Sequence, residues 1–214
     1  GVGQVRMYHS VLTQDEIRQN FNFTKPRYPN YFHGTLGAGT AKPAWNAGGY
    51  FEFDGSNDKV DISSVTIPVN DFSYSLWFKT DSTTKKQILI SHYNGGFSYG
   101  IQLNQSTNSA IGSYALQEGG STNYLATNSI TLDTTDWHNV VLTKSSSTGH
   151  ILYYDGNQIA INSSFTGPLQ RGTTTNQIGA STSANFFDGQ ISKFRVYDNV
   201  LTTTEITALY NEGE

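Results

Sequence analysis

The chain of 214 residues contains no cysteine. Disulfide bonds, thiolate zinc sites and cysteine nucleophiles are therefore all excluded. Secreted animal domains usually carry disulfides, so the absence argues against that class and fits a bacterial or phage protein.

Charge is also scarce, since charged residues make up 14% of the chain and the net charge is −4. No basic cluster is larger than Lys85-Lys86, so nucleic acid is not an expected partner. No stretch is long and apolar enough for a membrane-spanning helix, so a membrane is not expected either. The Ser-, Thr-, Asn- and Gly-rich surface that remains is typical of extracellular and virion proteins.

Short stretches of alternating hydrophobicity recur along most of the chain. In Phe72–Thr80, for example, Phe72, Tyr74, Leu76 and Phe78 share one face. Turn-forming sequences separate such stretches, and Asp155-Gly156-Asn157 is a strong hairpin signal. Tyr50–Ile62 reads as another hairpin, around the turn at 54–58. The pattern predicts an all-β fold, an antiparallel β-sandwich.

A strand, a corner and a short helix are predicted at the end of the chain. Ile191–Tyr197 alternates, Thr202 and Glu205 have the spacing of a capping box, and an apolar stripe follows. Residues 2–22 repeat this unit without a gap. We therefore expect strand–helix units at both ends: residues 1–24 as the end of a preceding similar domain, 25–43 as a linker, and 44–214 as the main domain.

Several motifs in order carry a family resemblance: Phe53–Val60, Phe72–Trp77, Trp137–Thr143, Leu152–Asn157, Ile178-Gly179 and the closing unit. Together they resemble the concanavalin A-like lectin/glucanase superfamily. More narrowly, they resemble the laminin-G-like and pentraxin-like modules of bacterial and phage multidomain proteins. The resemblance implies a jelly-roll sandwich of two curved sheets.

No catalytic pattern is present. Glucanases of this kind need paired carboxylates on alternate positions of one strand. Only Glu52-Phe53-Asp54 approaches that pattern, and the third acid is missing. Histidines such as His138 and His150 are isolated. We therefore expect a domain that is not an enzyme.

A metal site has weak support. Pentraxin-like modules hold calcium through acids after the Ile-Gly strand, but here Ala-Ser-Thr-Ser-Ala-Asn follows Gly179. A single structural calcium remains a candidate, with oxygen ligands from Asp54, Asn57, Asp58 and Asp188. The alternative is that these residues only form turns, and no other cofactor is expected.

Carbohydrate is the best-supported ligand class. Sugars are held by aromatic platforms and by polar or charged side chains that bind their hydroxyls. The candidate residues near turns are His92, Tyr93, Asn94, Phe97, Tyr99, Tyr114, Tyr124 and Arg171.

The leading hypothesis is thus a non-catalytic carbohydrate-binding or adhesion module that recognises a carbohydrate or cell-surface glycan. It would belong to a larger extracellular or virion protein and could form a homo-oligomer. The alternative is a purely structural virion module, such as a capsid decoration or tail-fibre segment, that binds other virion proteins. A glycoside hydrolase is a third and weaker reading.

Overall fold

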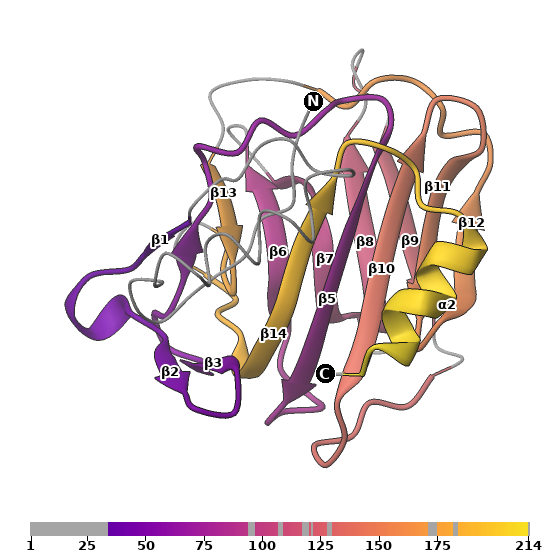
Figure 1. Ribbon diagram of the computed structural model, residues 1–214. Coiled ribbons are helices and arrows are strands. Elements are labelled where there is room, and N and C mark those ends of the chain that lie inside the picture. Colours follow the sequence, from indigo (N-terminus) through magenta and orange to yellow (C-terminus); the bar gives the residue numbers. More distant parts are fainter. Residues whose placement is uncertain are drawn as a thin grey trace, which may run out of the picture.

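Two antiparallel sheets pack face to face in the computed structural model (Figure 1), which describes residues 34–93, 97–106, 109–116, 120, 122–127, 130–170, 175–181 and 184–213. Sheet I has the order β1 (Thr35–Leu36), β4 (Val60–Asp61), β13 (Thr175–Ile178), β6 (Gln87–Tyr93), β7 (Phe97–Ser106), β8 (Ser109–Leu116), β9 (Thr122–Thr127). Sheet II has the order β12 (Asn157–Asn162), β11 (Gly149–Tyr154), β10 (His138–Ser145), β5 (Phe72–Thr80), β14 (Asp188–Tyr197), β3 (Tyr50–Asp54), β2 (Ala44–Asn46). A short helix η1 (Gly39–Ala41) and a helix α2 (Thr203–Asn211) complete the described elements. The all-β antiparallel sandwich expected from the alternation is confirmed.

The core lies between the sheets and follows the alternation of each strand. Phe72, Tyr74, Leu76 and Phe78 of β5 all point into it and are at most 1% exposed. Opposite them, sheet I contributes Tyr99 and Ile101 from β7, which are also fully buried. Removing these large side chains from water is the main force that holds the two sheets together.

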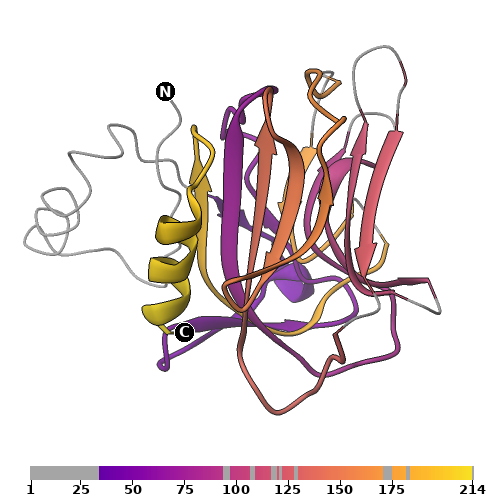
Figure 2. The ribbon, with the colours of Figure 1, turned by 90° about the vertical axis from the view of Figure 1, so that its right-hand side faces the viewer.

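Helix α2 covers the outer face of sheet II, as Figure 2 shows with the sheets seen from the side. Its buried residues Ile206 and Leu209 pack in a second apolar cluster with Val141 and Tyr153 of the sheet. Each such buried side chain contributes roughly 1.5–3 kcal/mol. The part of the outer face of sheet II over β10 and β11 is thereby covered by the chain itself (Figure 1).

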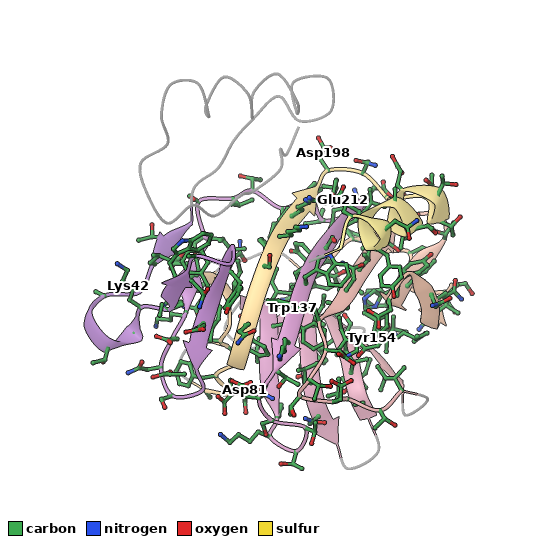
Figure 3. The ribbon with its side chains drawn as sticks, turned by 60° about the horizontal axis from the view of Figure 1, so that its bottom comes forward. Lys42, Asp81, Trp137, Tyr154, Asp198 and Glu212 are labelled. Atoms are coloured by element: carbon green, nitrogen blue, oxygen red, sulfur yellow. The ribbon has the colours of Figure 1, made fainter. Side chains whose placement is uncertain are left out.

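The start of α2 is fixed by the capping box expected from the sequence. Thr202 accepts a hydrogen bond from the backbone N–H of Glu205, and the Glu205 carboxylate accepts one from the backbone N–H of Thr202. At the other end, Glu212 lies beside β14 (Figure 3) and pairs with Arg195 at 2.6 Å. The C-terminal strand–helix unit is confirmed.

The hairpin expected over Tyr50–Ile62 is wrong. β3 belongs to sheet II, where it pairs with β2 and β14, whereas β4 belongs to sheet I, where it pairs with β1 and β13. Phe53 and Val60 both enter the core, so the chain crosses from one sheet to the other. The turn between them is held by side chains, since Asp54 accepts from Ser56 N and Asp58 accepts from Asp54 N.

Residues 34–49 contribute a strand to each sheet. β1 and β2 extend the edges of sheets I and II, and Trp45 packs on Phe51 at 4.9 Å. The predicted N-terminal strand–helix unit, residues 1–24, lies outside the described residues.

Candidate functional site

One row of cross-strand neighbours crosses sheet I from β4 to β9 on the side away from the core. In order, its members are Asp61, Gln177, Ser91, Gly100, Tyr114 and Tyr124. Their chain neighbours Ile178, Ile101 and Leu125 point into the core, so this row points outward. We call it the outer row.

The two ends of the outer row differ in exposure. Towards β13 and β6, Gln177 is 4% and Ser91 1% exposed, and the Ser91 hydroxyl donates to the Ala180 carbonyl at 2.6 Å. Towards β8 and β9, Tyr114 is half-buried and Tyr124 is 37% exposed. A ligand would therefore meet the row at its β8–β9 end.

Tyr114 and Tyr124 are direct partners in the β8–β9 register, and we call them the tyrosine pair. The ring of Tyr124 leans along the sheet over Gly112, because a Cβ on Gly112 would lie 2.8 Å from the Tyr124 hydroxyl oxygen and 3.2 Å from its Cζ. Glycine in a strand often marks such a close approach. The ring is thus held against the backbone on one side while more than a third of the residue stays open to solvent.

The next outward row along the strands is small and polar. It contains Gln102, Gly112 and Ala126, which are neighbours across β7, β8 and β9. Together with Gly100 beside Tyr114, these residues leave the aromatic rings as the largest outward side chains on β8 and β9. Chemically, the tyrosine pair can stack on an apolar ring face, and the exposed Thr122 of β9 offers a hydroxyl nearby for a hydrogen bond.

Two of the candidate ligand residues belong to the interior. Tyr99 is fully buried between Phe72 and Tyr74, with ring centroids 5.1 and 5.7 Å away, and burial raises the pKa of its hydroxyl. His92 is its register partner and is 8% exposed. The expectation that Tyr99 is placed to contact a ligand is wrong, because it alternates in step with Ile101 rather than with Gly100.

Of the remaining candidates, the structure describes Tyr93 and Phe97. Tyr93 and Phe97 are register partners at the ends of β6 and β7. Asn94 and Arg171 lie outside the described residues. Of the eight predicted ligand residues, the structure therefore brings Tyr114 and Tyr124 together on an open surface.

Behind the tyrosine pair, a buried polar chain joins the two sheets. His150 of β11 lies 3.0 Å from the Ser113 hydroxyl of β8 and 2.9 Å from the Asn123 amide oxygen of β9. The order Ser–His–Asn matches that of a nucleophilic triad, but Ser113 and His150 have no exposure. Burial, with Lys144 nearby, lowers the pKa of His150 to about 3, so the ring is neutral and sealed from substrate. His150 therefore links β11 of sheet II to the edge strand β9 of sheet I.

The candidate calcium ligands meet where β3 and β14 pair, and each has protein partners. Asp54 and Asp58 accept backbone hydrogen bonds within their turn, and Asp188 pairs with Lys85 at 2.8 Å. Asn57 donates to the Thr40 hydroxyl. In the described part of the chain, no group of three or more His, Asp or Glu side chains is placed to hold a metal. Calcium binding stays a prediction, and a melting curve with and without chelator tests it.

Sequence reasoning missed that Gly100, Gly112 and Gln102 face away from the core, beneath and beside the tyrosine pair. A signal was available, because Tyr99-Gly100-Ile101-Gln102 alternates apolar with small or polar residues. That alternation separates the buried Tyr99 from the outward Gly100. The contact of Tyr124 with Gly112 is diagonal across two strands and depends on a register that the sequence does not reveal.

Comparison with known proteins agrees with this architecture. Residues 54–207 match the family described as the concanavalin A-like lectin/glucanases superfamily. The chain belongs to this superfamily. No relative of the sequence was found among curated proteins.

Solved structures with the same fold come from several kinds of protein. One is domain 4 of AbnA, an extracellular GH43 arabinanase from Geobacillus stearothermophilus, which was solved with arabinotriose. Its TM-score is 0.65 at 18% sequence identity, and the match covers 83% of this chain and 87% of that one. The ligand-binding domain of botulinum neurotoxin serotype D, solved with N-acetylneuraminic acid, has a TM-score of 0.65 at 16% identity, covering 85% and 47%. A heptameric pentraxin from Limulus polyphemus has a TM-score of 0.59 at 15% identity, covering 78% and 84%.

This lectin-like chain spans about half the length of the toxin domain, with 47% of that chain covered. At these identities the likeness concerns the fold. Within the described residues, no helix has both the length and the hydrophobicity needed to cross a membrane.

Proposed function

We propose that the domain is a non-catalytic carbohydrate-binding module and that the tyrosine pair is its binding platform. One observation carries the proposal: the Tyr124 ring leans over Gly112 and remains 37% exposed beside Tyr114. A ring braced in this way loses little freedom when a sugar stacks on it, which favours binding. The arabinotriose complex of the similar AbnA domain is consistent with this use of the fold.

The test is a titration of the whole chain with soluble oligosaccharides, beginning with arabinotriose and extended by a glycan array. Tyr124→Ala is expected to weaken binding at least about tenfold, or about 1.4 kcal/mol. Tyr124→Phe keeps the ring and is expected to keep most of the affinity.

Tyr210→Ala is the matched control, because Tyr210 is 38% exposed but lies on α2, across the sandwich. Equal losses in Tyr124→Ala and Tyr210→Ala would place the ligand elsewhere. Absence of binding across broad glycan classes would overturn the proposed function.

A protein partner is the second candidate, and one residue favours it. Ile161 is 49% exposed, more than any other large hydrophobic side chain in the described part of the chain, and its strand β12 is an open sheet edge to which a partner strand could add. The domain would then act as a structural or adhesion module of a larger extracellular or virion protein. Binding to a coat or fibre protein that is lost in Ile161→Asp, together with an empty glycan array, would support this alternative over the first.

A further inference from the structure

The surface around the tyrosine pair is almost free of charge. From residue 87 to residue 127, the strands β6 to β9 and their turns contain a single Asp, Glu, Lys or Arg, which is Glu118. Glu118 lies outside the described residues. The outward-facing residues of these strands are neutral: Gln102 and Ser91 are buried, whereas Thr122 and Ala126 are exposed.

The nearest formal charge on the outer row is Asp61, and it is negative. It lies five strands from Tyr124, or about 24 Å at ~4.8 Å per strand. Two charges that far apart in water are screened, because the Debye length is about 8 Å at physiological salt. Asp61 therefore neither attracts nor holds a ligand at the tyrosine pair, and any residual effect repels an anion.

Of the described cations near this half of the sandwich, Lys144 and Lys85 are engaged elsewhere, and the exposed Lys86 precedes β6, three strands from β9. Lys144 has no exposure, and its ammonium donates to the carbonyls of Ser145 and Thr166 at 3.2 Å. Lys85, before β6, pairs with Asp188 of sheet II. His150 points inward from sheet II and is neutral.

From this distribution we propose that the ligand is a neutral glycan and that sialylated or uronic-acid glycans are rejected. A sugar carboxylate that leaves water needs a cation or several hydrogen-bond donors, and without them its desolvation is costly. A neutral sugar needs a ring to stack on and hydrogen-bond partners, which the Tyr124 ring and the exposed Thr122 hydroxyl two residues before it can provide. The inference rests on the proposed function and adds the class of sugar.

The experiment compares matched glycans that differ only by a terminal sialic acid or by oxidation of one hydroxymethyl group to a carboxylate. The whole chain is titrated with each pair at low and at high sodium chloride. We expect the neutral member to bind at least about tenfold more tightly and its affinity to change less than about twofold between the two salt concentrations, since no ion pair is screened. The Tyr124→Ala variant confirms that both members are read at the same surface.

Tighter binding of the acidic members, with affinity that falls as salt rises, would overturn the inference while leaving the proposed function in place. Strong salt dependence of neutral-glycan binding would also overturn it. If no glycan of either kind binds, the proposed function itself fails.

Discussion

The Asn123 amide oxygen lies 2.9 Å from His150 Nδ1, and this contact joins the edge strand of one sheet to the second strand of the other. β9 has a strand neighbour on one side only, which is β8. Leu125 of β9 packs in the core, and Asn123 also ties the strand to sheet II through His150. Since Tyr124 follows Asn123 directly, the link on the inner face positions the ring on the outer face.

Removal of this link is expected to loosen β9. His150→Leu fills the space of the ring with an apolar side chain but leaves the Asn123 amide oxygen without its partner. We expect the free energy of unfolding to fall by about 1–3 kcal/mol. Denaturant unfolding measures the loss of stability, and hydrogen exchange should quicken in β9 more than in β8. In a double-mutant cycle with Asn123→Ala, a coupling energy near zero would contradict the assignment.

Acid is expected to destabilise the protein through His150. Its pKa in the folded chain is about 3, below the ~6.5 of an unfolded histidine. The unfolded chain therefore takes up a proton first. The stability that depends on neutral His150 is fully present above pH ~6.5 and falls as the pH drops towards 3, by up to about 1.4 kcal/mol per pH unit. Urea unfolding at a series of pH values should show that the free energy of unfolding falls less steeply towards acid pH in His150→Gln than in the wild type.

His138 should act with the opposite sign. Burial disfavours its charge, yet Asp155 at 2.9 Å and Asp133 at 3.1 Å hold its pKa above the ordinary value. The stability that it contributes is fully present below pH ~6.5 and is lost as the pH rises through the folded pKa. We expect His138→Gln to lose more stability at pH 6 than at pH 9, and NMR titration of the ring to give a midpoint above 6.5. An equal loss at both pH values would show that the imidazolium is not the stabilising form.

Gly112 is expected to tolerate no side chain. In Gly112→Ala the new methyl would lie 2.7 Å from the Leu125 carbonyl oxygen and 2.8 Å from the Tyr124 hydroxyl. We expect a loss of about 1–3 kcal/mol, the usual cost of overpacking, and weaker glycan binding because the ring is displaced. Gly120→Ala is a comparison in a turn, where nothing lies within 4 Å of the added Cβ, although φ is +86° there. If Gly112→Ala bound glycan as the wild type does, the position of the Tyr124 ring over Gly112 would not matter for binding.

Lys144 should resist chemical labelling. Its ammonium is enclosed by backbone carbonyls and lies 5.8 Å from the centre of the Phe165 ring, with no exposed surface. Burial also lowers its pKa. With an amine-reactive ester and peptide mass mapping, the exposed Lys42 and Lys86 should react in the native protein, whereas Lys144 should react only after unfolding. Equal reactivity would indicate that this end of the sandwich opens readily.

Alternation in the sequence was enough to predict the sandwich, the inward face of β5 and the capped helix α2. It could not show which strands pair, because pairing depends on contacts between distant segments. The turn at 54–58 therefore read as a hairpin although β3 and β4 belong to different sheets. Tyr99 illustrates the same limit at the site. Its position near a turn predicts a ligand residue, although its alternation with Gly100 indicates a buried position.

Helix α2 and the tyrosine pair lie on opposite outer faces of the sandwich, over sheet II and sheet I respectively (Figure 2). The domain is therefore two-sided. Any neighbour that docks along the helix leaves the rings of Tyr114 and Tyr124 facing away from it. When several such domains are fixed to one scaffold through their helical sides, the faces that we propose to bind sugar would point outward together, and weak individual contacts would add up to firm attachment to a glycan-covered surface.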